Sequence, residues 1–257
     1  MSKCLVVLSG GQDSTTCLFL AKEQFDEVHA ISFDYGQNHV IELQSAAKIA
    51  NMADVDSFEI INIRNTLISS SPLTQGGLGL ERYESAEQME SVIGNRVEHT
   101  FVPMRNLLFL TIAVNRAVSL NCTHIYTGIC QEDNANYPDC TDNFRTLFED
   151  TANIALGLEP LKTGALRIIA PLMNLSKEES VKLAYNTSGA WEALAYSHTS
   201  YDGKYPPTDM NHANILRADG FKKAGLPDPL VIRAWNEGLM ELPLTNNYRA
   251  SRSLLEL

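Results

Sequence analysis

The sequence predicts an α/β fold, with a doubly wound, five-stranded parallel sheet and a small, mostly helical C-terminal part. Short apolar runs of strand length alternate with longer stretches of helical periodicity over most of the chain. Such alternation is typical of βαβ units, whose crossovers place helices on both faces of a parallel sheet. The first apolar run also leads directly into a glycine-rich turn that opens a helix.

Five segments are expected to form the strands. Residues 4–8, Cys-Leu-Val-Val-Leu, form an uninterrupted apolar run that is typical of a strand buried on both faces. The last strand is expected to stop at Pro171. The expected strands are 4–8, 28–33, 58–63, 124–127 and 167–170.

The helices between the strands follow from periodicity and from start signals. Ser176, with Glu179 three residues later, has the spacing of a capping box. The long polar stretch 65–100 lacks such signals and is expected to be a lid, a binding loop or disordered. The expected helices are 13–23, 39–52, 105–120, 142–156 and 176–185.

The chain is expected to divide into a nucleotide-binding α/β domain (1–195) and a smaller C-terminal subdomain (196–257). The C-terminal segment begins irregularly and then shows helical patterns at 211–224 and 230–240. A chain of 257 residues is long enough for one large domain with such an appendage.

Composition excludes several classes of function. The net charge is −11, and the densest basic spot is Lys222-Lys223, so direct binding of nucleic acid is not expected. No segment predicts a signal peptide or a membrane span, so we expect a cytoplasmic protein that acts on a small molecule. The five cysteines are odd in number and lack C-x-x-C spacing, which indicates free thiols in a reducing compartment.

The turn after the first strand is the strongest chemical signal. Gly10 and Gly11 allow the backbone to approach an anion closely, and the amides at the start of the following helix have no acceptor within it. Together with the helix dipole they predict a phosphate site, to which Ser9 and Ser14 add hydroxyl donors. The turn lacks the Gly-Lys-Ser/Thr of a Walker loop.

This turn resembles the PP-loop of ATP pyrophosphatases, which have the adenine nucleotide alpha-hydrolase-like fold. The resemblance implies that the loop binds the β,γ-pyrophosphate of ATP and that Asp13 works with Mg²⁺. The implied nucleotide-binding residues are Leu8, Ser9, Gly10, Gly11, Gln12, Asp13, Ser14 and, with weaker support, Gln37.

Further motifs narrow the resemblance to the 7-cyano-7-deazaguanine synthase (QueC) family over roughly residues 3–225. They occur in the family's order and follow the PP-loop. The motifs are Phe33-Asp34-Tyr35-Gly36-Gln37, Phe101-Val102-Pro103-Met104-Arg105-Asn106, Thr127-Gly128-Ile129-Cys130-Gln131-Glu132-Asp133 and Tyr137-Pro138-Asp139-Cys140.

The resemblance implies a ligase that uses ATP twice. Adenylation gives 7-carboxy-7-deazaguanine a leaving group, ammonia then forms the amide, and a second adenylation permits elimination to the nitrile. Asp13, Ser14 and Arg105 are the implied catalytic residues. The resemblance also implies a homodimer, for which Trp235 and Leu239 could supply a contact face or simply pack in the core.

Several side chains are assigned to the substrate, each beside a structural alternative. Arg105 suits phosphate or carboxylate, or is a surface arginine at a helix start. Asp133 and Asp139 are expected either to accept hydrogen bonds from the N–H groups of the deazapurine or to cap the loop in which they lie. Tyr137 is placed to stack on the base, or it fills space.

Two features depart from the family. Met104 stands where the family usually has glycine, and is expected to fill space and alter how Arg105 is presented. The four cysteines that bind zinc in the family are replaced by neutral side chains, which are poor zinc ligands, so we expect no zinc and a bend held by hydrogen bonds and Pro206-Pro207. The four positions are Ser200, Thr208, Asn211 and Asn214.

These departures leave alternatives open. A divergent branch could stop at 7-amido-7-deazaguanine or pass the activated acid to another amine. Another PP-loop amidating or tRNA-thiolating enzyme, and an inert nucleotide sensor, are the remaining readings. The acidic balance weighs against the tRNA enzyme, and the intact loop from Ser9 to Ser14 weighs against the sensor.

Overall fold

The structure, a computed structural model, describes residues 1–37, 40–74, 79–131, 137–160, 162–244 and 248. One all-parallel sheet has the strand order β3-β2-β1-β4-β5, with Val6 of β1 in register with Ala30 of β2 and Tyr126 of β4. The chain reverses its direction of winding between β1 and β4, and ligands of doubly wound sheets bind at such a switch point. The strands are β1 (Lys3–Val7), β2 (Glu27–Asp34), β3 (Ser57–Asn62), β4 (His124–Tyr126) and β5 (Arg167–Ile169).

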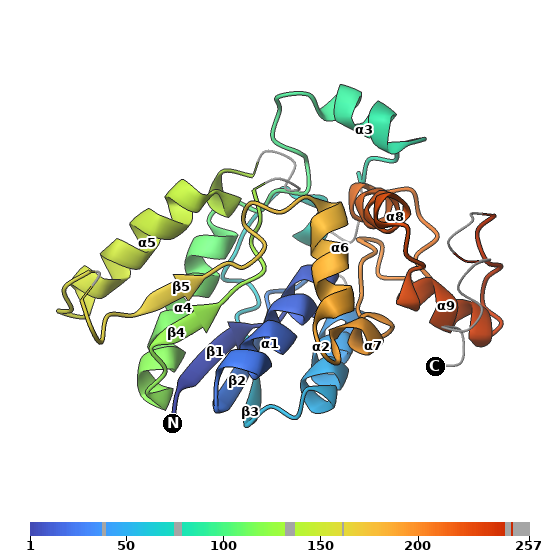
Figure 1. The fold of residues 1–257 in the computed structure, drawn as a ribbon. Helices are drawn as coiled ribbons and strands as arrows, with labels where there is room; N and C mark the ends of the chain where they lie inside the picture. Colours follow the sequence, from blue (N-terminus) through green and yellow to red (C-terminus); the bar gives the residue numbers. More distant parts are fainter. Residues whose placement is uncertain (38–39, 75–78, 132–136, 161, 245–247, 249–257) are drawn as a thin grey trace.

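Helices cover both faces of the sheet, as expected of a doubly wound fold (Figure 1). Cys4 and Val6 of β1 pack with α1 and α2, whereas Leu5 packs on the other face with α4 and α5. This division follows from the period-two alternation of side chains along a strand. The helices of the two faces are α1 (Gln12–Gln24), α2 (Val40–Met52), α4 (Arg105–Leu120) and α5 (Asp142–Ala155).

The predicted strands and sheet helices are confirmed to within two residues, but the stretch 65–100 is more ordered than expected. It contains the short helix η1 (Pro72–Thr74) and the helix α3 (Ala86–Ile93). Ser85 caps α3 by accepting a hydrogen bond from the amide of Gln88. Met89 and Ile93 of α3 cluster with Ile215, so this segment packs on the C-terminal part, above α8 in Figure 1.

The chain after β5 is helical, and α6 packs against both α1 and α8, so it joins the sheet to the predicted C-terminal helices α8 and α9. Val181 of α6, Trp191 of α7 and Phe221 of α8 form one cluster. The capping box predicted at Ser176 is confirmed, α7 was not foreseen, and the last helix ends four residues earlier than expected. Within the described ranges, no helix is both long and apolar enough to span a bilayer. The helices are α6 (Lys177–Asn186), α7 (Ala190–Leu194), α8 (His212–Ala224) and α9 (Pro229–Asn236).

Candidate active site

A cavity of about 280 Å³ opens at the carboxyl ends of β1, β2 and β4. The glycine-rich turn forms one wall of this cavity, and the start of α4 forms another. The structure therefore brings most of the predicted nucleotide site to one place. The predicted residues that line the cavity are Leu8, Ser9, Gly11, Gln12, Asp13, Ser14, Gln37 and Arg105.

The turn presents an open helix start to this cavity. Gly11 is the N-cap of α1 and offers no side-chain oxygen to the first-turn amides, which also lack acceptors within the helix. The hydroxyls of Ser9 and Ser14 lie 3.0 Å apart, and Ser14 Oγ also accepts a hydrogen bond from the amide of Ser9. Because amides and hydroxyls converge here under the positive end of the helix dipole, the turn is suited to bind phosphate.

Glycine is required at two positions around the turn. Gly10 has a φ of +84°, and a Cβ there would lie 2.5 Å from the carbonyl oxygen of Glu42 in α2. A Cβ on Gly128, just after β4, would lie 2.9 Å from the amide nitrogen of Ser14. These close approaches let three elements meet around the turn, and a larger residue at either position would force them apart.

Among the described residues that line the cavity, Arg105 carries the positive charge. Burial works to lower the pKa of Arg105, but the neighbouring Tyr35, Tyr137 and Asp139 hold it above its ordinary value. The guanidinium is therefore charged at all relevant pH values. It is placed to bind a phosphate or a carboxylate in the cavity.

Met104, which precedes Arg105, adopts the left-handed conformation with a φ of 65°. Glycine is favoured in this conformation because it has no Cβ to clash with the backbone. The Met104 side chain is 58% exposed and does not line the cavity, so the expectation that it fills space in the site was wrong.

Gln37 lines the cavity, but its amide is engaged in the turn after β2. The Gln37 side chain accepts a hydrogen bond from the amide of Tyr35 at 2.8 Å and donates one to the carbonyl of Phe33 at 2.9 Å. It therefore shapes the wall of the cavity by fixing the end of β2.

The residues assigned to the deazapurine are less well placed. Asp139 accepts a hydrogen bond from the amide of Asn106 and so caps α4, and its pKa is raised by burial against the opposing effects of Asn106 and Arg105. Tyr137 is buried beside Phe101 and hydrogen-bonds Glu98. Neither lines the cavity, which favours the structural alternative for both. Asp133 lies outside the described residues.

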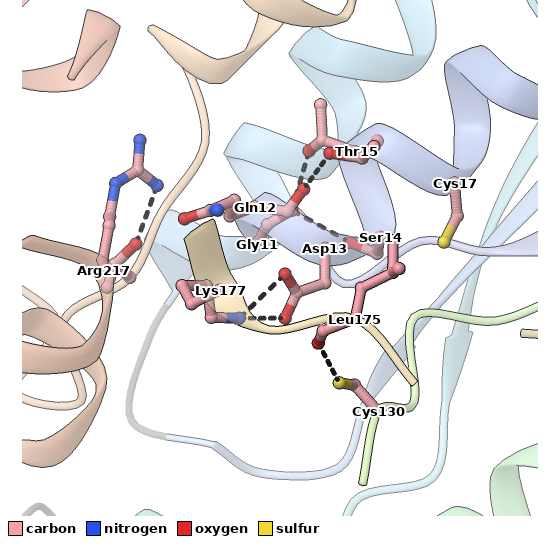
Figure 2. Close-up of polar contacts among 12 residues, drawn as sticks. Gly11, Gln12, Asp13, Ser14, Thr15, Cys17, Cys130, Leu175, Lys177 and Arg217 are labelled. Carbon is pink, nitrogen blue, oxygen red and sulfur yellow. Dashed lines mark hydrogen bonds and ion pairs between the residues drawn. The ribbon is translucent and has the colours of Figure 1, made fainter. Parts of the chain in front are cut away.

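Lys177 is a residue of the site that sequence reasoning missed. Its Nζ lies 3.0 Å from both carboxylate oxygens of Asp13, and its side chain is only 11% exposed (Figure 2). The capping box at Ser176 fixed where α6 begins, but a pairing across 164 residues depends on how α6 packs against α1.

The comparisons with known proteins agree with this geometry. A model of the family described as "Queuosine biosynthesis protein QueC" matches residues 3–225. The 7-cyano-7-deazaguanine synthase of Gloeobacter violaceus is 44% identical over 234 residues, which cover 90% of this chain and 96% of the relative. That of Laribacter hongkongensis is 46% identical over 230 residues, which cover 89% and 94%. The chain belongs to the QueC family.

Among solved structures, an NH3-dependent NAD synthetase from Campylobacter jejuni is a distant neighbour of this QueC-family chain. It has a TM-score of 0.40 at 16% identity, and the match covers 95% of this chain and 90% of that one. A likeness this distant carries no information about the substrate.

In this member of the QueC family, three of the four residues that replace the family's zinc cysteines form a hydrogen-bonded cluster. The buried Ser200 Oγ donates to Asp202 and accepts from the side-chain amides of Asn211 and Asn214, at 3.2 and 2.9 Å. Thr208, the fourth position, is exposed. The neutral donors of this cluster do not fit zinc, which in proteins is bound by thiolate, imidazole and carboxylate.

The cysteines are buried and free throughout the described part of the chain. Burial raises the pKa of Cys140 to about 12 and that of Cys17 well above its ordinary value. Both thiols are protonated at neutral pH, so neither is suited to act as a nucleophile.

Proposed function

We propose that this QueC-family chain uses ATP to convert 7-carboxy-7-deazaguanine and ammonia to 7-cyano-7-deazaguanine. The observation that carries the proposal is the joint placement, in one cavity, of an uncapped helix start and the guanidinium of Arg105. The first suits the phosphates that ATP loses, and the second suits the negative charge of the acid or the α-phosphate.

For this reaction the protein has to position the reactants and stabilise the developing charge, and it does not have to supply a nucleophile. A carboxylate oxygen attacks the α-phosphorus of ATP and displaces pyrophosphate, whose phosphates are bound by the turn formed by Ser9 to Ser14. Ammonia then attacks the acyl carbon, AMP departs, and the amide remains. In the second round the amide oxygen is adenylated, and loss of AMP with two protons yields the nitrile.

The negative charges that develop in these steps lie near groups of the protein that can stabilise them. The amides at the start of α1 stabilise negative charge on the departing phosphates, and Arg105 stabilises charge near the reacting carboxylate. Asp13 would hold Mg²⁺, which when bound neutralises part of the phosphate charge. Leu8 and Phe109 contribute apolar side chains to the lining of the same cavity.

We further propose that the chain works without zinc. At the four family positions the chain has hydroxyls and amides in place of thiolates, and Ser200, Asn211 and Asn214 are joined by hydrogen bonds, so no metal is needed to neutralise thiolates. Metal analysis of the purified chain is expected to find no stoichiometric zinc, and a zinc chelator should leave its melting temperature unchanged. A chelator-dependent fall in melting temperature would contradict this part of the proposal.

The homodimer is also a proposal, since it rests on family membership. Trp235 and Leu239 at the end of the described C-terminal part are 38% and 52% exposed, which is compatible with a contact face. Light scattering of the purified chain distinguishes a dimer from a monomer.

The decisive experiment is to incubate the full chain with MgATP, 7-carboxy-7-deazaguanine and ammonium, and to identify the product by mass spectrometry. We expect the nitrile together with AMP and pyrophosphate. Accumulation of 7-amido-7-deazaguanine as the end product would show a variant that stops halfway. Absence of pyrophosphate release with this acid would overturn the assignment.

A further inference from the structure

Glu42, in the first turn of α2, lies beside the phosphate turn because α2 packs tightly against that turn. A Cβ on Gly10 would lie 2.5 Å from the carbonyl oxygen of Glu42 and 2.8 Å from the amide nitrogen of Ala46. The glycine therefore allows the backbone of Glu42 to approach the turn closely. The Glu42 side chain lines the same cavity as Arg105, in which the proposed function has ATP cleaved.

The Glu42 carboxylate has no partner within the part of the chain that the structure describes. It makes no hydrogen bond or ion pair there, and Arg105 affects it only as a nearby charge. Asp13, the other carboxylate that lines the cavity, is paired with Lys177, whose Nζ lies 3.0 Å from both of its oxygens. Glu42 is therefore the carboxylate of this cavity that is available to a substrate.

The amidation step of the proposed function needs a proton acceptor in this cavity. A simple amine is almost fully protonated at neutral pH, and the ammonium ion has no lone pair with which to attack a carbonyl carbon. A proton must therefore leave ammonium before the new C–N bond forms. A base positioned in the site typically accelerates such a step by about 10²–10⁴-fold.

The other side chains of the cavity are poorly suited to accept this proton. The described residues that line it include no histidine and no lysine. Burial raises the pKa of Tyr35 and that of Cys140 to about 12, and it also raises the pKa of Tyr201 above its ordinary value. These groups keep their protons at neutral pH, and the guanidinium of Arg105 has no acceptor, which leaves Glu42.

We propose that Glu42 is the general base of the amidation step and takes a proton from the ammonium ion in the cavity. One N–H bond of ammonium breaks and one O–H bond forms on the carboxylate, while the electron pair stays on nitrogen. The ammonia attacks the acyl carbon of the adenylate, AMP leaves, and its phosphate takes the extra proton of the new amide nitrogen. Glu42 then returns its proton to solvent. The inference rests on the proposed function for the acyl adenylate.

The surroundings of Glu42 determine the pH range in which it can act. Burial raises its pKa to about 7, against the opposing charge of Arg105. Tyr35 and Tyr201, which line the cavity with it, are neutral in this range. Glu42 is therefore ionised, and able to accept a proton, above about pH 7, and a base is most effective when its pKa lies near the working pH.

The elements on the other side of Glu42 hold their charges in ion pairs. There Glu42 lines a smaller cavity together with Lys177 of α6, His198, and His212 and Arg217 of α8. Both cations are held by aspartates, at distances of 2.6–3.0 Å. The ring of His198 bonds a backbone carbonyl, and burial and Lys177 lower the pKa of His212 to about 4, so its imidazole is neutral.

The test uses the full chain and separates adenylation from amidation. Glu42→Gln keeps the size of the side chain but cannot accept a proton. Isotope exchange between pyrophosphate and ATP, measured with the acid and without ammonium, should stay close to that of the unchanged chain. With ammonium just above neutral pH, kcat/KM for ammonium should fall by about 10²–10⁴-fold.

Hydroxylamine distinguishes proton transfer from positioning. It is mostly unprotonated at neutral pH and needs no base, so Glu42→Gln should convert the adenylate to the hydroxamate at nearly the rate of the unchanged chain. The pH profile gives a second criterion. In the unchanged chain, kcat/KM for ammonium should rise to about pH 7 and then level off, because Glu42 must be ionised. In Glu42→Gln it should keep rising as free ammonia becomes more abundant.

Two further variants serve as controls. Glu42→Asp keeps a carboxylate on a shorter side chain and should restore part of the rate with ammonium. Glu84→Gln, at an exposed position, should leave every readout unchanged.

Three results would overturn the role of Glu42. They are an unchanged rate and pH profile with ammonium in Glu42→Gln, an equal loss with ammonium and hydroxylamine, and a loss of isotope exchange. Each would leave the proposed function standing as long as the unchanged chain forms the nitrile. A lack of both nitrile and pyrophosphate release in the unchanged chain would instead overturn the function, and the inference with it.

Discussion

Two helix starts in this molecule are buried and polar, yet one lacks a side-chain N-cap and the other has one. α1 begins at Gly11 without a side-chain cap, whereas α8 begins at Asn211, whose side chain accepts the amide of Asn214. Around α1 the buried Gln12 Nε2 has no hydrogen-bond partner among the described residues. Around α8 the side-chain amides of Asn211 and Asn214 both donate to Ser200, although Asn214 Oδ1 has no partner in the part of the chain that the structure describes.

The difference separates a binding site from a scaffold. A helix start with glycine as its N-cap is less stable than one with asparagine by only roughly a few tenths of a kcal/mol, and it keeps its amides available to an anion. A capped start with neutral side chains gains stability and offers little to a ligand. Substitutions at the first start should therefore change activity, and substitutions at the second should change the free energy of unfolding.

The largest expected effect is on activity at the open start. Asp13→Asn keeps the shape of the side chain but removes the charge that pairs with Lys177 and that would hold Mg²⁺. We expect kcat/KM for pyrophosphate release to fall by about 10²–10³-fold, the size of loss seen when one preorganised electrostatic group is removed. Asp142→Asn, an acid in the first turn of α5, is the matched control and should leave turnover unchanged. Equal activity of the two variants would contradict the role of Asp13.

The next effect is on stability at the closed start. Ser200→Ala removes the acceptor shared by the Asn211 and Asn214 amides, and Ser200 is fully buried. We expect a loss of about 2 kcal/mol in the free energy of unfolding, measured in urea, because buried donors are left unpaired. Thr208→Ala, at the exposed family position, should change stability by less than about 0.5 kcal/mol. If both variants unfold alike, the cluster does not hold this region.

Much of this arrangement was predictable from the sequence, because its signals are local. The strands follow from apolar runs, and the phosphate turn follows from Ser9 to Ser14 beside the first strand. Local signals also existed for α3, where Ser85 and Gln88 have the spacing of a capping box, but the polar composition of 65–100 outweighed them. The short α7 has no comparable signal in the sequence.

Contacts between distant segments were not predictable in this way. Lys177 reaches Asp13 only because α8 packs on α6 and Gly220 leaves room for the lysine stem. Asp139 is drawn away from the cavity by the amide of Asn106, a contact that forms only when the loop after β4 meets α4. These pairings are tertiary, and a single sequence carries residue types without their distances.

A smaller effect concerns the protonation of Glu42, a residue of α2 in the wall of the cavity. Burial raises the pKa of Glu42, which lines the cavity of the candidate active site, to about 7 against the opposing effect of Arg105. In the unfolded chain Glu42 ionises near pH 4.5, whereas in the folded chain it stays protonated up to about pH 7. Stability is therefore lost as the pH rises from about 4.5 to about 7 and levels off above that value.

Glu42→Gln mimics the protonated form and should not lose this stability. Because Glu42 is only partly buried in the cavity wall, we expect the variant to gain about 1 kcal/mol over the unchanged chain between pH 5 and pH 8. Urea unfolding at both pH values measures the difference, and the exposed Glu84→Gln is the control. If the unchanged chain and both variants show the same pH dependence of the free energy of unfolding, the pKa of Glu42 is not raised in the folded chain.

The smallest effect is a gain in stability beside the open start. Met104 has a left-handed backbone that costs a residue with a Cβ about 1–2 kcal/mol, and glycine avoids this cost while losing about 0.5–1 kcal/mol through the entropy of the unfolded chain. Met104→Gly should therefore raise the free energy of unfolding by about 0.5–1 kcal/mol. Since the Met104 side chain is exposed and does not line the cavity of the candidate active site, activity should stay unchanged. Asn121→Gly, at the left-handed C-cap of the same helix, separates the effect of the backbone from the position, because asparagine tolerates this conformation and should gain less. A loss of activity in Met104→Gly would mean that the methionine, and not only the backbone at its position, presents Arg105 to the cavity.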